Sequence, residues 1–444
     1  MDHSAGCRAE LLAKIQRREA CVAVLGLGYV GLPLVRAFTR AGLPTIGYDI
    51  DQAKIDALNE GRDYLQHPAP GLAKELLHSG RFGATSDPAD LVFADALLVC
   101  VPTPLNNNRE PDLSYVERTI DTISAVLAPG RLVVLESTTY PGTTREIVLP
   151  RLESAGLRAG DNLFVAFSPE REDPGSPGRS TQSIPKLVGG VDDASTEVAT
   201  ALYRTAIETV VPVGSAEVGE AAKLLENVYR SVNIALVNET KLILEKLGID
   251  PLEVIDAAAT KPFGFQRFDP GPGLGGHCIP IDPYYLAWCA RRAGIDARFV
   301  ELAGEINGAM PGHVVARLEE ALRERGSALD SANILVLGLA YKKNIDDVRE
   351  SPSAEIIRML KSAGAVVEYS DPHIPATHPG RKGDLAMSSV DLTPERLAHA
   401  DAVVIATDHD AFDWSMIGEH ARLIVDTRGR MRSIANVRGE VVTA

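Results

Sequence analysis

The chain lacks several features that mark secreted, membrane-bound and nucleic-acid-binding proteins. Its five cysteines have no spacing typical of a disulfide framework or a zinc site, which favours a reducing compartment and predicts no metal. No segment approaches the ~20 apolar residues of a membrane span, and the charged residues 1–20 contain no apolar stretch of a signal peptide. A net charge of -15 argues against nucleic acid and anionic membranes as partners. We therefore expect a cytoplasmic protein with neither kind of partner.

Aromatic residues are also scarce, at 5%, but 45% apolar and 24% charged residues are typical of globular proteins. A chain of 444 residues is too long for one hydrophobic core, so two or three domains are expected. Short apolar runs at 21–25, 44–48, 96–101 and 132–135 alternate with helix-length segments, one of them at 30–40. This alternation predicts parallel strands in a doubly wound α/β sheet.

The last third of the chain repeats the pattern of the first. The segment CVAVLGLGYVG matches NILVLGLAYKK, IGYDID matches VEYSDP, and ADALLVCVPTP matches ADAVVIATDHD, in the same order. Each set reads as a strand, a glycine turn, a helix and a strand that ends at an aspartate. We interpret this as two Rossmann-like domains on either side of a helical middle.

The middle contains one long segment, 215–247, with helical periodicity and no proline, and Gly248 is a plausible C-terminal cap. A helix of this length spans ~45 Å, which suggests a bridge between domains or a dimer interface; a single long core helix is the alternative. We expect an N-terminal Rossmann domain at 1–210, a central helical domain at 211–325 and a C-terminal Rossmann-like domain at 326–444.

The turn Gly26–Gly31, with the sequence GLGYVG, follows a predicted strand and opens a predicted helix. In a dinucleotide site the first glycine permits the tight turn, the second admits the pyrophosphate, and the third allows close helix packing. Asp49 ends the next strand, where a carboxylate accepts from ribose hydroxyls and repels a 2′-phosphate. The pattern predicts NAD as the cofactor; a turn that only packs is the alternative.

The C-terminal copy of this turn keeps Gly338 but replaces the later glycines with AYKKN. Lys342 and Lys343 then stand where a pyrophosphate would be bound, which suits a nucleoside diphosphate better than a second dinucleotide. A solvated lysine pair in a loop is the alternative.

Residues 271–283, with the sequence GPGLGGHCIPIDP, are too rich in glycine and proline for a helix or strand. This shaped loop presents Cys278, with Asp282 four residues later, and its glycines leave room for a ligand. His277 either lowers the pKa of the Cys278 thiol or makes a structural hydrogen bond. The other four cysteines are interpreted as inert small hydrophobic residues.

Two further polar groups stand out. Lys223 and Asn227 share one face of the predicted long helix, and that face can meet the cysteine loop. Glu170 follows a predicted strand at 163–167, within the loop sequence SPER. The alternative interpretation is that Lys223 and Asn227 belong to a solvated helix face and that Glu170 is part of a surface turn.

These motifs together resemble those of the UDP-glucose/GDP-mannose dehydrogenase family over nearly the whole chain. The segments GLGYVGLPL, VPTPL, ESTTYPGTT, FSPERE, EAAKLLENVYR, GPGLGGHCIPIDP and YKKNIDDVRESPS occur in the order of that family. The resemblance implies an N-terminal NAD domain, a central helix that forms a homodimer, and a C-terminal domain that binds the nucleotide of a UDP-sugar.

The resemblance also implies roles for individual residues. Cys278 is similar to the family's nucleophile, and Glu170 to its general acid/base. Lys223, Asn227 and Asp282 resemble the groups that organise the catalytic water and the oxyanion, and Thr138 resembles the water-positioning threonine. Where some members have a second glutamate, this chain has Pro174, so that role is not assigned.

The residues expected to bind NAD are Gly26, Gly28, Tyr29, Val30, Gly31, Asp49, Thr103, Thr138 and Arg349. Those expected to bind the substrate are Glu170, Lys223, Asn227, Lys261, Arg267, Gly275 and Lys342, of which Lys261 and Arg267 are alternatives for a basic residue that reaches the neighbouring subunit.

The implied reaction is the four-electron oxidation of a sugar CH2OH group to a carboxylate through a cysteine thiohemiacetal and a thioester. UDP-N-acetylglucosamine is the expected substrate, with the N-acetylgalactosamine and N-acetylmannosamine epimers and UDP-glucose as alternatives. Two other classes remain open: a two-electron hydroxyacid dehydrogenase, which needs no cysteine loop, and a non-catalytic NAD-binding scaffold, which needs none of the polar cluster.

Overall fold

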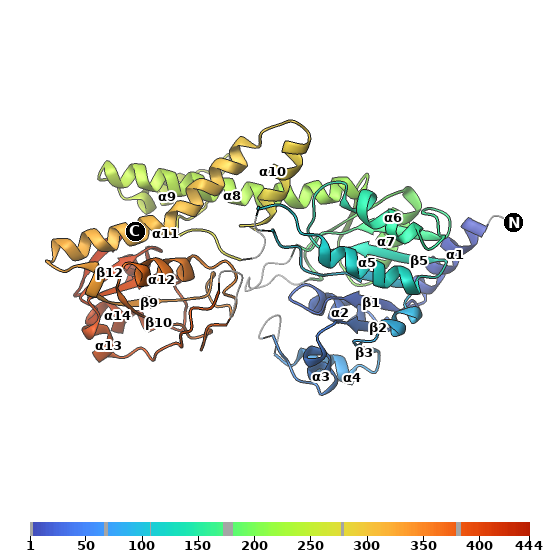
Figure 1. Cartoon of the computed structure of the whole chain (residues 1–444), viewed down its shortest axis with the longest axis horizontal. Coiled ribbons are helices and arrows are strands. Elements are labelled where there is room, and N and C mark those ends of the chain that lie inside the picture. The colour runs from blue at the N-terminus through green and yellow to red at the C-terminus, as the bar shows by residue number, and fades with distance from the viewer. Residues whose placement is uncertain (1–2, 66–69, 107, 172–180, 277–278, 379–382) are drawn as a thin grey trace. The chain divides into compact units, whose positions relative to one another are not determined.

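The computed structural model describes residues 3–65, 70–106, 108–171, 181–276, 279–378 and 383–444. The chain divides into two compact units. The first consists of residues 1–226 and 284–295, and the second of residues 227–283 and 296–444. The long helix α8 (Ala216–Lys246) therefore contributes residues to both (Figure 1).

The first unit contains an eight-stranded sheet in the order β3-β2-β1-β4-β5-β6-β7-β8. From β1, successive strands are added first on one side (β2, β3) and then, from β4 onwards, on the other, as the predicted doubly wound topology requires. The strands are β1 (Val22–Leu25), β2 (Thr45–Tyr48), β3 (Phe82–Thr85), β4 (Ala96–Val99), β5 (Arg131–Leu135), β6 (Leu163–Phe167), β7 (Lys186–Gly190) and β8 (Val210–Pro212).

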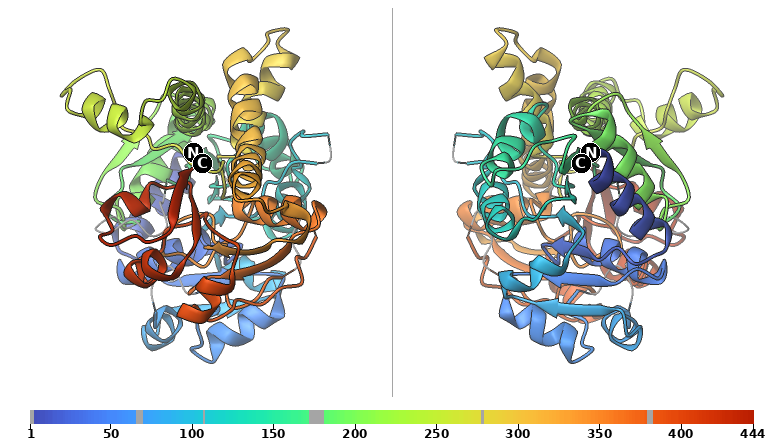
Figure 2. Two further views of the ribbon diagram at one scale, coloured as in Figure 1. Left: turned by 90° about the vertical axis from the view of Figure 1, so that its left-hand side faces the viewer. Right: turned by 90° about the vertical axis from the view of Figure 1, so that its right-hand side faces the viewer.

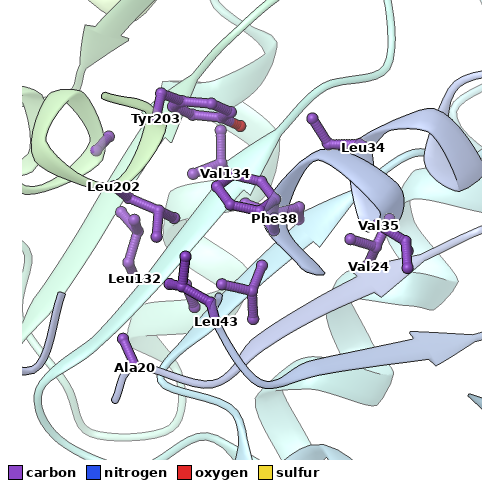
Figure 3. Close-up of a cluster of buried hydrophobic side chains, with 14 of the residues drawn as sticks. Ala20, Val24, Leu34, Val35, Phe38, Leu43, Leu132, Val134, Leu202 and Tyr203 are labelled. Carbon is purple, nitrogen blue, oxygen red and sulfur yellow. The ribbon is translucent and has the colours of Figure 1, made fainter. Parts of the chain in front are cut away.

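Alternate residues of each strand serve two cores, one on each face of this sheet. In β1, Val22 and Val24 pack with α2 (Gly31–Arg40), whereas Ala23 and Leu25 pack with α5 (Ser114–Val126) on the opposite face. Figure 3 shows the first of these cores, in which Val24, Phe38 and Tyr203 are buried together. The strands read as unbroken apolar runs because both of their faces are covered.

The remaining helical segments of the first unit are α1 (His3–Gln16), α3 (Gln52–Asn59), α4 (Leu72–His78), η1 (Pro88–Phe93), the π-helical turn η2 (Thr144–Val148), α6 (Leu149–Glu153) and α7 (Asp193–Tyr203). Helix α1, which the sequence patterns did not predict, packs against α7 (Figure 2). Its Leu11 and Ile15 are buried in the same core as Val22.

One pair of strands differs from the all-parallel expectation: β6 and β7 run antiparallel. A parallel pair needs a crossover connection, usually a helix, whereas an antiparallel pair does not. The sequence between the two strands, rich in proline and glycine, offers no helical pattern for such a crossover. Strand β8 then pairs in parallel with β7 after the crossover helix α7.

The second unit contains a five-stranded parallel sheet in the order β10-β9-β11-β12-β13. The predicted second Rossmann-like domain is thus confirmed, and so is the α/β fold class. Its strands are β9 (Asn333–Leu337), β10 (Val366–Ser370), β11 (Ala402–Ile405), β12 (Leu423–Asp426) and β13 (Glu440–Thr443).

The helices of the second unit are α9 (Pro251–Ala259), α11 (Arg298–Glu324), η3 (Leu329–Ser331), α12 (Pro352–Ser362), α13 (Pro394–His399), α14 (Trp414–His420) and η4 (Arg430–Ser433), and α10 (Asp282–Arg292) begins in it. The side chains of Asn238 and Asn307 join α8 to α11 by a buried hydrogen bond of 2.9 Å. Among the described residues, no helix is both long and apolar enough to cross a membrane.

Candidate functional site

The three glycines of the first turn occupy three different environments. Gly26 has a φ of +97°, and a Cβ there would lie 2.5 Å from the carbonyl oxygen of Cys100. A Cβ on Gly31 would lie 1.9 Å from the carbonyl oxygen of Gly26, so this residue permits the close packing of α2. Gly28 has no atom within 4 Å of its missing Cβ. The open side of the turn is therefore at Gly28, where a pyrophosphate is expected.

The start of α2 also fits a phosphate. Its N-cap, Val30, makes no side-chain capping hydrogen bond. In the first turn, the Leu32 N–H donates to the Gly28 carbonyl oxygen and Pro33 has no N–H, so the attraction of this helix end for an anion comes mainly from its dipole. The turn Gly26–Gly31, with Tyr29 and Val30 between its glycines, thus has the geometry that a dinucleotide requires.

Asp49, at the end of β2, is buried beside this turn. One carboxylate oxygen accepts from the backbone N–H of Leu27 at 2.9 Å and from Nζ of Lys54 at 2.9 Å; the other accepts from the Asp51 N–H at 3.0 Å. These bonds hold the carboxylate in one orientation. Sequence reasoning missed Lys54, which the structure pairs with this carboxylate.

Replacing Asp49 with asparagine is expected to raise the KM for NAD and to reduce the preference for NAD over NADP by roughly 10-fold, because one charge repelling a 2′-phosphate is lost. Steady-state kinetics with both cofactors would measure the change. Asp56→Asn, in the exposed part of α3, is the matched control. An unchanged ratio of the two cofactors would show that Asp49 does not face the ribose.

Thr103 and Thr138 come from two neighbouring strand ends and are in direct contact. The Thr103 hydroxyl donates to the backbone oxygen of Thr138 at 2.8 Å. The backbone oxygen of Thr103 accepts in turn from the hydroxyl of Tyr285. The two loops that carry these threonines are therefore joined at the carboxyl end of the sheet, where ligands of such sheets bind.

Glu170 and Lys223 lie together in the first unit. Glu170 follows β6, and Lys223 is on α8; their charged atoms are 3.8 Å apart, and their side chains are 15% and 6% exposed. This ion pair is therefore largely shielded from water. Glu170 also lines a small pocket with Val30, at the start of α2. The structure thus brings a candidate acid/base group next to the cofactor turn.

Asn227 and Asp282 form the corresponding contact in the second unit. The Asn227 amide donates to the carboxylate of Asp282 at 2.5 Å, and both side chains are buried. Asp282 is the first residue of α10. The sequence placed these residues in one cluster, and the contact agrees with that placement. Cys278 and His277 lie outside the described residues.

The glycines that precede Cys278 pack against their own unit. A Cβ on Gly275 would lie 2.4 Å from Cβ of Tyr341, and one on Gly276 would lie 2.9 Å from the Tyr341 ring. The Gly276 N–H also donates to the Arg349 carbonyl at 2.9 Å. The space at these two glycines is therefore filled by Tyr341, whereas the sequence interpretation had left it for a ligand.

In the second glycine turn a carboxylate binds two amides, whereas in the first turn Asp49 binds the N–H of Leu27 alone. The N–H groups of Leu339 and Ala340 donate to the carboxylate of Asp371 at 2.6 and 2.9 Å. The Nε2 atom of His409 lies 3.2 Å from the same Asp371 oxygen. The Nδ1 atom of His409 accepts a hydrogen bond from the Asn344 N–H. The Ala340 N–H, which corresponds to that of Gly28 in the first turn, is thus already bonded to a carboxylate.

The basic residues of this turn have partners within the unit. Lys343 is paired with Asp410 at 2.6 Å, so it is held at the rim of the turn. The guanidinium of Arg349 donates to both carboxylate oxygens of Asp347. Lys342 is partly buried in the same loop.

The two candidates for a basic residue that reaches a partner subunit are both exposed. Lys261 stacks on the ring of Phe263, and Arg267 is paired with Asp256 and Asp269 at 2.6 and 2.8 Å. These two ion pairs raise the pKa of the Arg267 guanidinium. Neither contact distinguishes between the candidates.

The described cysteines agree with the interpretation of inert residues. Burial raises the pKa of the thiols of Cys21 and Cys289 to about 11, and that of Cys100 well above its ordinary value. A thiol with a raised pKa is neutral at physiological pH and is a poor nucleophile.

Sequence reasoning missed three buried charged residues around this site. Glu136, at the end of β5, and Lys186, at the start of β7, form a buried ion pair of 2.5 Å. Glu220, on α8, accepts from the N–H groups of Gly142 and Thr144, and its burial raises its pKa to about 7. In the sequence, Glu136 directly follows one apolar run and Lys186 directly precedes another, and this position was the signal by which they could have been found.

The chain matches three family models in sequence order. They are the NAD binding domain of the UDP-glucose/GDP-mannose dehydrogenase family at residues 20–207, its central domain at 217–309, and its UDP binding domain at 335–433. The chain belongs to the UDP-glucose/GDP-mannose dehydrogenase family. It is thereby an NAD-dependent nucleotide-sugar 6-dehydrogenase, which confirms the expected class, cofactor and UDP-sugar substrate.

Individual relatives agree with this assignment. A UDP-N-acetyl-D-mannosamine dehydrogenase from Pyrococcus horikoshii is 37% identical over 413 residues, 92% of this chain and 95% of that protein. A UDP-N-acetyl-D-glucosamine 6-dehydrogenase from Pseudomonas aeruginosa is 36% identical over 88% of this chain and 91% of that protein. A solved structure of the Pyrococcus UDP-D-ManNAc dehydrogenase has a TM-score of 0.85 at 34% identity and covers 95% of this chain and 99% of that one.

Proposed function

We propose that the substrate is a UDP-N-acetylhexosamine, first of all UDP-N-acetylglucosamine, oxidised at C6 to the uronic acid. The support is the similarity to the Pseudomonas glucosamine enzyme and the motifs FSPEREDPG, KPFGFQ and HCIPIDPYYL. UDP-N-acetylmannosamine is a second candidate, because the Pyrococcus relative is 37% identical over 413 residues, against 36% over 396 residues for the Pseudomonas enzyme. The N-acetylgalactosamine epimer and UDP-glucose remain alternatives within the same reaction.

The observation that carries the catalytic proposal is the buried ion pair of Glu170 and Lys223. A two-electron dehydrogenase of the hydroxyacid type has no use for a cysteine loop, and a scaffold has no use for a buried pair that lines a pocket beside the cofactor turn. Buried charges are costly unless they are paired, so their retention at a pocket favours a chemical role.

Each polar residue has one proposed task. Bound NAD accepts the hydride in each of the two oxidations. Lys223, or a water held by Asp282, takes the proton of the C6 hydroxyl, and Cys278 adds to the resulting aldehyde to give a thiohemiacetal. This covalent bond keeps the aldehyde in the site between the two oxidations.

The second oxidation converts the thiohemiacetal to a thioester, which water then hydrolyses. Glu170 takes a proton from that water, and Thr138 positions it, so the thiolate of Cys278 leaves and the carboxylate is released. Lys223 and Asn227 stabilise the oxyanion, each contributing roughly 3 kcal/mol in the transition state. The hydrogen bond from Asn227 to Asp282 holds that amide in place.

The test is the NADH yield with limiting UDP-N-acetylglucosamine, UDP-N-acetylmannosamine, UDP-N-acetylgalactosamine and UDP-glucose in parallel. We expect two NADH for each molecule of UDP-N-acetylglucosamine, because the four-electron reaction uses two NAD. Two NADH from another sugar would move the assignment to that epimer. One NADH per sugar would contradict the thioester mechanism.

We further propose a homodimer formed through α8, with domains at 1–210, 211–325 and 326–444, and a cytoplasmic location that fits the low cysteine content. Five apolar side chains of α8 are 47–65% exposed: Val218, Leu225, Tyr229, Leu236 and Ile243. They recur at intervals of seven and four residues, so they form one stripe along the helix. Such a stripe fits the same stripe on a second copy.

Replacing Leu236 with glutamate is expected to shift the protein from dimer to monomer at micromolar concentration, because a charge would be buried at the centre of the stripe. Sedimentation velocity measures the change. Leu236→Met keeps the apolar surface and should leave the dimer intact. If Leu236→Glu sediments as the wild type does, the stripe is not the interface.

A further inference from the structure

The buried ion pair of Glu136 and Lys186 lies where three elements of the first unit meet. The Lys186 ammonium contacts the Glu136 carboxylate at 2.5 Å and donates to the carbonyl oxygen of Pro169 at 3.1 Å. It also lies 5.2 Å from the centre of the Tyr203 ring. The other Glu136 oxygen accepts from the Tyr203 hydroxyl. One ammonium group thereby links the ends of β5 and β6 to helix α7.

Both strand ends lead directly to residues with a proposed catalytic role. Glu136 is two residues before Thr138, and Pro169 immediately precedes Glu170. Lys186 and Glu136 also line the same pocket as Glu170 and Val30. The position of Glu170 relative to Thr138 thus depends on a lysine that comes from a third strand.

The chemistry of this pair does not fit a role in stability alone. Removing two charges from water costs more than their attraction returns unless further hydrogen bonds are present, and apolar replacements are often as stable. Here the two further bonds, to the Pro169 carbonyl and the Tyr203 hydroxyl, are the ones that fix the geometry of the strand ends. The Lys186 ammonium donates to a main-chain oxygen next to Glu170 at 3.1 Å, and a displacement of about 1 Å at a catalytic group can cost about 100-fold in rate.

We propose that Lys186, held by Glu136, is a positioning residue of this enzyme that fixes Glu170 against Thr138 for hydrolysis of the thioester. The inference rests on the proposed role of Glu170. Lys186 itself transfers no proton in this scheme: its ammonium stays bonded to Glu136 and to the Pro169 carbonyl.

The test uses the full-length enzyme and two replacements. Lys186→Met alone leaves the Glu136 charge buried without a partner, so it is compared with the double variant Glu136→Leu/Lys186→Met, which removes both charges. We expect the double variant to keep its melting temperature within a few degrees and its KM for NAD and sugar within about 3-fold. Its kcat should fall about 100-fold, with the acyl-enzyme accumulating in intact-mass spectra.

A second comparison separates positioning from a general structural effect. If Lys186 acts through Glu170, adding Glu170→Gln to the double variant should slow it no further than Glu170→Gln alone. Effects that multiply would overturn the proposal, as would a double variant with normal kcat. Lys14→Met, which removes a part-buried ion pair with Asp95 at 3.0 Å in the same unit, is the matched control and should keep its kcat.

Failure of the proposed function has a different signature. A Glu170→Gln enzyme that turns over at the wild-type rate would remove the acid/base role of Glu170. Loss of kcat in the double variant would then have to arise elsewhere, and the positioning inference would be overturned with it. A slow Glu170→Gln enzyme combined with a fast double variant would overturn the inference about Lys186 alone.

Discussion

Replacing Cys278 with serine is expected to reduce formation of the uronic acid by at least about 10³-fold while leaving NAD and UDP-sugar binding nearly unchanged. The reason is that a serine hydroxyl is a much weaker nucleophile than a thiolate at neutral pH. Without the thiohemiacetal there is no covalent adduct for the second oxidation. The variant should therefore release aldehyde or stop after one NADH.

The measurement is acid formation and NADH yield, with ligand binding followed by calorimetry. Cys289→Ser is the matched control, since that half-buried thiol has a pKa raised to about 11 and no proposed role. Acid formation at the wild-type rate by Cys278→Ser would remove the covalent mechanism. Equal losses in the two variants would point to general damage of the fold.

Replacing Lys223 with methionine is expected to lower kcat by about 10²–10³-fold, the effect of losing one donor to a developing oxyanion. The change also leaves Glu170 mostly buried without its cationic neighbour at 3.8 Å. Hydrolysis of the thioester, which depends on Glu170 in the proposed mechanism, should therefore slow together with the first oxidation.

Pre-steady-state NADH formation and kcat would show both effects. Lys246→Met, at the exposed end of the same helix, is the control and should behave like the wild type. A Lys223→Met enzyme with normal kcat would exclude this lysine from the oxyanion and base roles together. A slower first oxidation with normal hydrolysis of the thioester would retain the oxyanion role and separate Lys223 from Glu170.

Features that depend on neighbouring residues were predictable. The five strands expected between residues 21 and 167, the turn Gly26–Gly31 and the long helix α8 lie within one or two residues of their expected positions, because apolar runs, glycine turns and helical periodicity act over short distances. The repeated pattern also predicted the second parallel sheet. Asp49 was expected at the end of β2 because strand order places it beside the glycine turn.

Features that depend on residues far apart in the chain could not be predicted from the sequence. Glu136 and Lys186 are 50 residues apart, and only the antiparallel pairing of β7 with β6 brings the lysine to the carboxyl end of the sheet. Similarly, His409 closes the carboxylate of Asp371 from 38 residues away. No local pattern distinguishes these residues from exposed charges.

The sequence by itself determined the two nucleotide-binding sheets, the NAD turn and the set of polar residues on which the proposed chemistry depends. These follow from short-range sterics: the space at glycines, the alternation of side chains along a strand, and the order of strands and helices. The tertiary structure alone decided which carboxylates are held by which cations, because pairing and burial are set by contacts between strands and helices far apart in the chain. Lys186 acquires its proposed role from those contacts.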